Sequence, residues 1–361
     1  MCALGDNLEY THRKERLIFL DLIKIFSAIV IYMGHSIKMF GCSYGNQKLD
    51  TVVLAARILV MICFFVVSGF SIYYNNSEIN ILNTDNLKNF YIKRFITIAP
   101  TYFLIHILSY ILVDTSIRQA IYATPIDILC LQSMYGGLFG ILHNGATWFI
   151  SSLMLGYFVY PLVQELINAN KNHLSLVPII FFIIILYSEI VMPQVFGTPP
   201  GYVNPVFRAI QFSSGVVLCA TLLKGNQTFK FSKMLLINLF IACILMTMFS
   251  FYNGMGKEYL ILPAGCFLIF AGLIVSFYVR PKRLTQNRLI RYASGLSYYF
   301  FILQAFLWNI AGPICEFTGL NNNKWKILIS FSLCVILSVL MNELFDKPVK
   351  KFLKRKLLKS I

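Results

Sequence analysis

Long apolar segments separated by short polar ones dominate the chain. Ten of them are long enough to cross the roughly 30 Å hydrocarbon layer of a membrane as a helix, which takes about 20 mostly apolar residues. They lie near residues 17–39, 52–75, 95–113, 145–167, 176–193, 205–223, 233–252, 259–279, 293–316 and 325–345. Because a chain in lipid must satisfy its backbone hydrogen bonds internally, the pattern predicts an all-α fold, a polytopic transmembrane helix bundle with about ten spans.

One further apolar stretch, 126–142, decides the topology. Asp127 and the Gly136-Gly137 pair interrupt it, so we interpret it as a re-entrant or interfacial segment. With ten spans and the N-terminus inside, most of the 31 lysines and arginines fall in cytoplasmic segments, as the positive-inside rule requires. We therefore predict a multi-pass plasma-membrane protein with both termini in the cytoplasm.

This topology divides the chain into three parts. We expect a cytoplasmic N-terminal segment at 1–16, one transmembrane domain at 17–345 and a basic cytoplasmic tail at 346–361. The run KKFLKRKLLK in the tail is typical of an amphipathic segment on the membrane surface, and the lipid bilayer is thus a direct partner.

Composition excludes several classes of function. The chain has 361 residues, of which 58% are hydrophobic and 13% charged, against about 45–50% and 25% in soluble domains. The net charge of +16 does not indicate nucleic-acid binding, because the basic residues lie between the apolar segments and in the tail. The nine cysteines form no Cys-x-x-Cys pair, so we predict no disulfide framework and no metal site.

Three ionisable residues on the first predicted span are candidates for catalysis: Asp21, Lys24 and His35. An ionisable group within a span is costly and usually functional. Lys24 and His35 are eleven positions apart, which places them on one helix face about 16 Å apart along the axis. Asp21 precedes Lys24 by three positions and lies within reach for an ion pair. A histidine suits general acid–base chemistry near neutral pH. A structural alternative stays open, in which His35 is interfacial and Lys24 reaches the surface beside Asp21.

Further cations are candidates for binding an anionic ligand. Arg57 and Arg208 fall inside spans, where a guanidinium suits bidentate contact with phosphate or carboxylate. The alternative for both is a structural pair with a carboxylate, for which the sequence offers Glu165, Glu189 and Glu343. Lys93 and Arg94 open the third span from the cytoplasmic side, where a phosphate-rich cofactor would arrive. The alternative for Lys93 is ordinary topological anchoring.

Several different short motifs follow one another along almost the whole chain. They are LDLIKIFSAIVIYMGH (Leu20–His35), FFVVSGFSIYY (Phe64–Tyr74), FYIKRFITIAP (Phe90–Pro100), TWFISSLMLGYFVYP (Thr147–Pro161), FRAIQFSSG (Phe207–Gly215), SYYFFILQ (Ser297–Gln304) and FDKP (Phe345–Pro348). In this order they resemble the motifs of the acyltransferase 3 family of integral membrane acyltransferases, in its branch acting on surface polysaccharides. Three positions depart from the family pattern: Thr97 replaces an arginine, Gln304 a histidine and Asp346 a glutamate.

The resemblance implies transfer of an acetyl or other acyl group from acyl-CoA to a hydroxyl of a cell-surface or lipid-linked saccharide. His35 would act as general base or acyl relay, with Lys24 attracting the donor and Asp21 holding Lys24. Lys93, Arg94 and Arg208 would bind the acyl-CoA. Trp148, Ser68 and Arg57 would line the acceptor side, Trp148 as a wall and Ser68 at a close helix approach rather than as a nucleophile. No metal is implied, and polysaccharide-assembly proteins are candidate partners.

Two other classes of function stay open. A transporter or flippase for a lipid-linked saccharide would also need many spans, and the polar face with Asp21, Lys24 and His35 could relay protons. An inactive scaffold in a polysaccharide-assembly complex would fit the departures at Thr97 and Gln304. Transfer of label from acetyl-CoA to a glycan would identify the enzyme.

Overall fold

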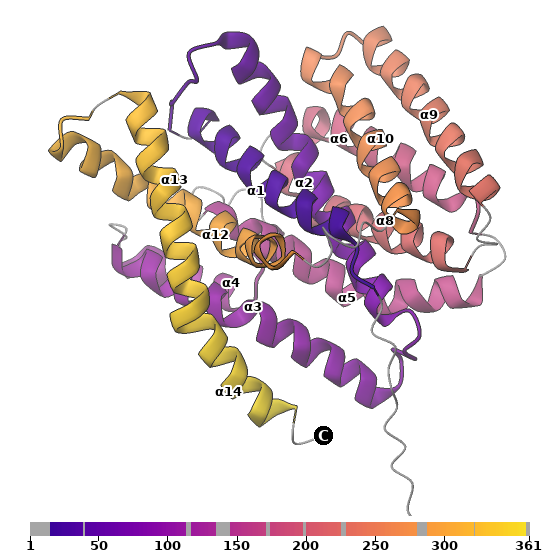
Figure 1. Ribbon diagram of the computed structural model, residues 1–361, viewed down its shortest axis with the longest axis horizontal. Coiled ribbons are helices and arrows are strands. Elements are labelled where there is room, and N and C mark those ends of the chain that lie inside the picture. Colours follow the sequence, from indigo (N-terminus) through magenta and orange to yellow (C-terminus); the bar gives the residue numbers. More distant parts are fainter. Residues whose placement is uncertain are drawn as a thin grey trace, which may run out of the picture.

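The computed structural model describes residues 15–38, 40–112, 117–134, 145–170, 174–197, 200–224, 229–279, 287–320 and 322–358. Within these ranges the chain forms helices and no strand (Figure 1). The long helices are α1 (Ile18–Lys38), α2 (Gln47–Asn76), α3 (Thr84–Leu112), α5 (Trp148–Ala169), α6 (Val177–Phe196), α8 (Pro205–Lys224), α9 (Phe229–Tyr252), α10 (Lys257–Tyr278), α12 (Arg288–Phe317) and α13 (Asn323–Leu340). The short ones are α4 (Ile117–Ile128), the 3₁₀ turn η2 (Gly145–Thr147), α7 (Pro200–Val203), the π-helical turn η4 (Met341–Asp346) and α14 (Lys347–Leu357).

Each of the ten predicted spans lies on one of these long helices. Nine helices in the described ranges are long and apolar enough to cross a membrane, and the predicted span 293–316 lies within α12, which has 30 residues. The all-α prediction of a polytopic helix bundle is therefore confirmed. The cytoplasmic position of the two termini stays a prediction.

Two helices begin well before the apolar segments that predict them. α2 begins at Gln47 because the side chain of Asn46 caps it, accepting from the backbone nitrogens of Lys48 and Leu49. α3 begins at Thr84 rather than near 95. Both first turns are polar, and hydropathy detects only the part of a helix that lies in lipid.

The stretch 126–142 is not a span in its described part. α4 ends at Ile128 and a turn follows up to residue 134, while residues 135–142 lie outside the described ranges. Cys130 has a left-handed backbone, with φ of 54°, and helps to end α4, where the Leu131 nitrogen donates to the Ile126 carbonyl.

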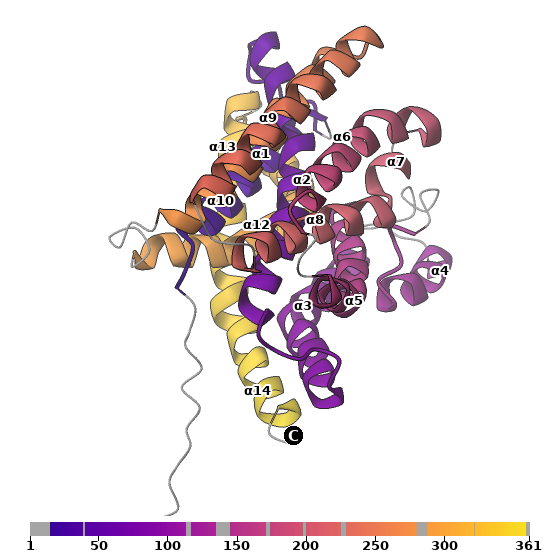
Figure 2. The same cartoon turned by 90° about the vertical axis from the view of Figure 1, so that its right-hand side faces the viewer.

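The centre of the bundle is the crossing of α2 with α8, and α1 and α10 also pack against α2 (Figures 1 and 2). Glycines bring the two backbones together. A Cβ added at Gly69 would lie 1.9 Å from the carbonyl oxygen of Phe212, and one added at Gly215 would lie 1.9 Å from that of Val66. Small residues at such crossings are how membrane helices pack closely. The close approach predicted at Ser68-Gly69 is thus present.

The chain after α13 remains part of the bundle. η4 continues α13 into α14, which lies beside α3 (Figures 1 and 2). Asp346, at the end of η4, is 1% exposed. The basic segment from 346 onward is therefore anchored at its beginning among the transmembrane helices.

Candidate functional site

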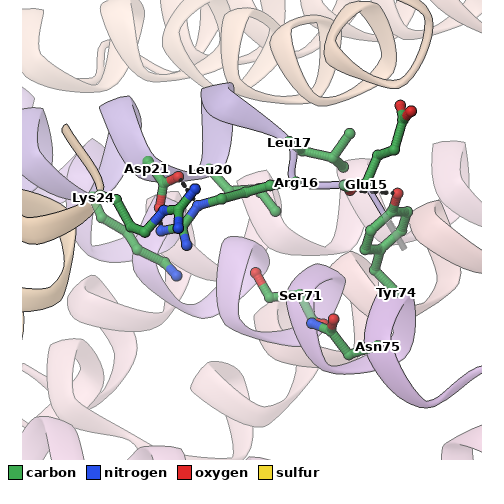
Figure 3. Close-up of a pocket in the computed structure, with 10 residues that line it drawn as sticks. Glu15, Arg16, Leu17, Leu20, Asp21, Lys24, Ser71, Tyr74 and Asn75 are labelled. Carbon is green, nitrogen blue, oxygen red and sulfur yellow. Dashed lines mark hydrogen bonds and ion pairs between the residues drawn. The ribbon is translucent and has the colours of Figure 1, made fainter. Parts of the chain in front are cut away.

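The start of α1 carries a buried ion pair that differs from the predicted one. Asp21 is 4% exposed and pairs with Arg16, whose Nε and Nη2 lie 2.5 and 2.7 Å from its carboxylate oxygens (Figure 3). The Ser294 hydroxyl on α12 donates to the same carboxylate at 2.7 Å. The hydrogen bond from Arg16 to Asp21 raises the pKa of the guanidinium. The predicted pairing of Asp21 with Lys24 is wrong, because Arg16 folds back over the beginning of the helix and takes the carboxylate.

Lys24 is thereby left without a carboxylate within ion-pair distance in the described part of the chain. Its side chain lines two cavities, of about 490 and 270 Å³. We call the larger one the mouth cavity and the smaller one the inner cavity. Lys24 thus borders both cavities and forms no ion pair within 4 Å in the described part of the chain.

The mouth cavity is polar and rich in cations. It is lined by Glu15, Arg16, Leu17, Leu20, Asp21, Lys24, Ser71, Tyr74, Asn75 and Arg291. Figure 3 shows the two sides of this cavity, with Arg16, Asp21 and Lys24 on the α1 side facing Ser71 and Asn75 on α2. Its three cations, Arg16, Lys24 and Arg291, outnumber its two carboxylates, Glu15 and Asp21, so the cavity has a formal net charge of +1.

The inner cavity is more apolar and contains hydroxyl groups. Its walls come from five helices and the start of α14: Lys24, Phe64, Ser68, Thr97, Ile98, Phe149, Ile150, Leu153, Tyr157, Ser294, Gly295, Ser297, Tyr298, Tyr299, Phe301 and Lys350. An apolar space with a few convergent polar groups is the usual form of a small-molecule site.

His35 lies in the half of α1 further along the chain, away from both cavities. The side chains of Arg57 on α2 and Gln304 on α12 lie beside its imidazole. Arg57 packs directly on α1, since a Cβ at Gly34 would meet its side chain at 2.6 Å. Three buried polar atoms here have no hydrogen-bond partner among the described residues: His35 Nδ1, Arg57 Nε and Gln304 Oε1. Such groups are costly unless a ligand or water satisfies them.

Arg208 and Glu189 form a buried ion pair, one of the alternatives left open by the sequence. Arg208 is 1% exposed and donates to Glu189, to Gln211 at 2.9 Å and to the carbonyl of Tyr202. Gln211 in turn donates to Glu189 at 2.6 Å. The guanidinium is thus saturated by protein groups, and Arg208 lines neither cavity.

Tyr202 on α7 brings three predicted residues together. Its ring centre lies 5.7 Å from the guanidinium carbon of Arg57, 4.9 Å from that of Arg208 and 5.3 Å from the ring of Trp148. Trp148 is buried and also stands 5.8 Å from the Arg208 guanidinium. The sequence analysis did not identify Tyr202. This residue lies on a helix of four residues, which is too short to show a periodic pattern of apolar positions.

The basic pair at the start of the third span separates in space. Lys93 is exposed, whereas Arg94 is half-buried between the rings of Phe90 and Tyr157, at 5.5 and 5.8 Å. Tyr157 lines the inner cavity, so Arg94 stands behind its wall. Only Thr97 and Ile98 of α3 reach the cavity itself.

The sequence analysis also did not predict a polar cluster formed by residues of α3, of α4 and of the turn after it. His106 Nδ1 lies 3.2 Å from Asp127, which accepts from Tyr110 at 2.6 Å and from Gln132 at 2.8 Å. Burial tends to raise the pKa of Asp127, but the hydrogen bonds from these neighbours hold it below its ordinary value. The sequence marked Asp127 only as an interruption of an apolar stretch, and nothing in the spacing pairs it with His106.

The described residues contain no group of three or more His, Cys, Asp or Glu side chains that could hold a metal ion. The apolar helices make this a multi-pass membrane protein, and its bundle contains two cavities and a polar cluster around His35. A family model described as an acyltransferase domain matches residues 17–343. The chain therefore belongs to the acyltransferase 3 family and is a membrane acyltransferase. Comparisons with curated proteins and with solved structures give no match.

Proposed function

We propose that the protein transfers an acetyl or other acyl group from acyl-CoA to a hydroxyl of a cell-surface or lipid-linked saccharide, at the plasma membrane. The observation that carries the proposal is the position of Lys24. It lines the cationic mouth cavity and the apolar inner cavity, on the same helix that carries His35. The family supports acyl transfer, and the cavities favour a donor with an anionic head and a less polar arm.

The donor would enter through the mouth cavity. Coenzyme A carries several phosphate charges, and Lys24 and Arg291 offer ammonium and guanidinium donors for phosphate oxygens. A phosphate group beside Lys24 would lie at the border of the two cavities, and the arm that carries the thioester would continue into the inner cavity. Its aromatic walls would limit the access of water to the thioester. Lys93 and Arg94, on the helix beside this cavity, would add to the positive potential that attracts the donor.

His35 would act on the acceptor. Its Nδ1 has no protein partner in the described residues, so a neutral imidazole can accept the hydroxyl proton there. The hydroxyl oxygen attacks the thioester carbonyl carbon, the carbon–sulfur bond breaks, and the proton passes through His35 to the leaving thiolate. Arg57 and Gln304 would stabilise the negative charge that develops on the carbonyl oxygen. Covalent relay of the acyl group by His35 is the second form of this mechanism.

The saccharide would bind near Arg57, with Trp148 as part of the wall behind it. Tyr202 lies between Arg208 and Arg57, and the Arg208–Glu189 pair holds the segment around Tyr202 in place. Lys24 and His35 are about 16 Å apart along α1, so an extended donor arm must bridge them. The bilayer gives a lipid-linked acceptor direct access, and polysaccharide-assembly proteins would deliver others.

The test uses purified protein with labelled acetyl-CoA and a surface-glycan extract as acceptor. Replacing His35 with alanine should lower acyl transfer about 10²–10⁴-fold, the usual contribution of a general base. Binding of CoA should be unchanged, because His35 lies away from both cavities. Full transfer activity in His35→Ala would refute the assignment. Movement of an unmodified solute across vesicles, without labelled glycan, would support a carrier instead.

A further inference from the structure

The inner cavity has a charged residue that the proposed mechanism does not use. Lys350, in the first turns of α14, lines this cavity together with Lys24, Thr97 and Tyr299. Its side chain is 21% exposed. The other charged residues of α14, at 347, 351, 354, 355 and 356, are exposed and line none of the cavities described above. Lys350 therefore differs from the rest of the basic segment by its position.

A network of hydrogen bonds holds Lys350 at the cavity. Its Nζ lies 2.5 Å from Asp346, which also accepts from Thr101 at 2.8 Å and from Tyr299 at 2.5 Å. These bonds join α3, α12, η4 and α14. Asp346 thus accepts from two hydroxyl groups as well as from Lys350, so its negative charge is shared among three donors.

The ammonium group of Lys350 keeps donor capacity for a ligand. It has three hydrogens, of which Asp346 takes one, and a second points at the Tyr299 hydroxyl at a long 3.5 Å. A buried carboxylate and an ammonium with a free donor beside a cavity form a positioned cation, the arrangement that suits a phosphate oxygen.

The neighbouring wall of the cavity, formed by α3, carries no charged side chain. Thr97 of α3 faces the same cavity and carries no charge, although an arginine occupies this position in the pattern that the chain resembles. Arg94, one turn earlier, points between Phe90 and Tyr157 instead. On this side of the cavity the cationic group is the Lys350 ammonium of α14, which is paired with Asp346 and keeps a hydrogen to donate.

We propose that Lys350 binds a phosphate group of the acyl donor at the inner cavity, so that α14 is part of the acyltransferase site. The proposal rests on the proposed function, because it takes acyl-CoA as the ligand. Lys24 and Lys350 then hold the anionic part of the donor from two different helices. Asp346 is a positioning residue that keeps the ammonium in place.

The experiment measures CoA binding to the purified full chain in nanodiscs of a neutral phospholipid, by calorimetric titration. Lys350→Met should weaken CoA binding about tenfold, the value of one charge-assisted hydrogen bond. Lys350→Arg should bind within about threefold of the unchanged protein, since it keeps the charge. Lys354→Met is the matched control, with the same change on the exposed face of α14, and should bind normally.

Two further binding measurements distinguish a direct contact between Lys350 and the ligand from a purely structural role of Lys350. Pantetheine, which lacks phosphate, should bind equally well to Lys350→Met and to the unchanged protein. Adding Thr97→Arg to Lys350→Met should restore CoA binding, because it returns a cation to the same cavity. The melting temperature of every variant is recorded beside its affinity.

The outcomes are distinct. If the unchanged protein does not bind CoA, the proposed function itself fails. If the unchanged protein and Lys350→Met bind CoA equally, or if pantetheine binding falls as much as CoA binding, only the inference about Lys350 is overturned. A lipid headgroup as the true ligand would show itself in nanodiscs with anionic phospholipid, where CoA binding to the unchanged protein would drop to the level of Lys350→Met.

Discussion

The crossing of α2 with α8 predicts a large effect from a very small substitution. The Cβ of Gly69→Ala would lie 1.9 Å from the carbonyl oxygen of Phe212, where ordinary contact begins near 3.4 Å. The obstacle is backbone, which cannot rotate away as a side chain can. The helices must therefore move apart by roughly 1.5 Å or distort. Overpacking of this kind costs about 1–3 kcal/mol.

Activity should suffer more than stability. α2 carries both Ser68, at the inner cavity, and Arg57, beside His35. A shift of about 1 Å at a catalytic group can cost about 10²-fold in rate. We therefore expect Gly69→Ala to remain folded but to lose most of its acyl transfer.

Thermal unfolding in detergent measures the stability part. A thiol-reactive dye reports unfolding, because Cys63 on α2 and Cys219 on α8 are buried. At about 2–4 °C per kcal/mol, a cost of about 1–3 kcal/mol should lower the melting temperature by about 2–12 °C. Gly215→Ala should lower the melting temperature by a similar amount. The double variant should lose less stability than the sum of the two single losses, because one separation of the helices accommodates both methyl groups.

Gly312→Ala is the control for the intrinsic effect of the substitution. It lies inside α12, and an added Cβ would meet nothing within 4 Å. Alanine in an open helical position should leave stability unchanged or raise it by about 0.5–1 kcal/mol. A melting temperature of Gly69→Ala equal to that of the unchanged protein would refute the close crossing.

Two further predictions concern buried charges. Glu189→Ala should destabilise the protein by about 3–5 kcal/mol, because it leaves the charge of Arg208 buried without a carboxylate partner. Thermal unfolding measures this loss of stability. A smaller loss in the double variant Glu189→Ala/Arg208→Met would confirm that the unpaired charge is the cause. Asp127→Asn should lower the melting temperature at neutral pH. Because the folded-state pKa of Asp127 lies below its ordinary value, the carboxylate stabilises the fold above about pH 4 and loses this contribution as the pH falls through the folded-state pKa. The melting temperatures of Asp127→Asn and the unchanged protein should therefore converge in acid, and a constant difference at every pH would contradict the role of the charge.

Hydropathy was sufficient to predict the spans, because the cost of exposing backbone and polar groups to lipid leaves few alternatives to an apolar helix. It could not locate the polar first turns of α2 and α3, which Asn46 and other local contacts stabilise. It also gave no sign of α7 or of the π-helical turn η4. Short elements depend on packing rather than on a period of apolar residues.

The candidate site was only partly accessible from the sequence. Helical spacing placed Lys24 and His35 on one face of a helix. It also favoured Lys24 as the partner of Asp21, whereas Asp21 pairs with Arg16, which precedes the helix. The contacts of His35 with Arg57 and Gln304 join residues far apart in the chain, and spacing within one segment carries no information about them. The same holds for the Asp346 network.

The π-helical turn η4 determines how α14, the helix that follows it, is rotated about its axis relative to the bundle. A π turn holds about one residue more than an α-helical turn, and such turns commonly mark functional sites. Each residue of a helix adds about 100° of rotation, so the extra residue in Met341–Asp346 decides which side of α14 meets the bundle. The cavity-facing place of Lys350, and the outward place of its basic neighbours, thus depends on the length of this turn as much as on the identity of the lysine. An insertion or deletion there would act like a change of side chain at 350, although it would leave the composition of the helix intact.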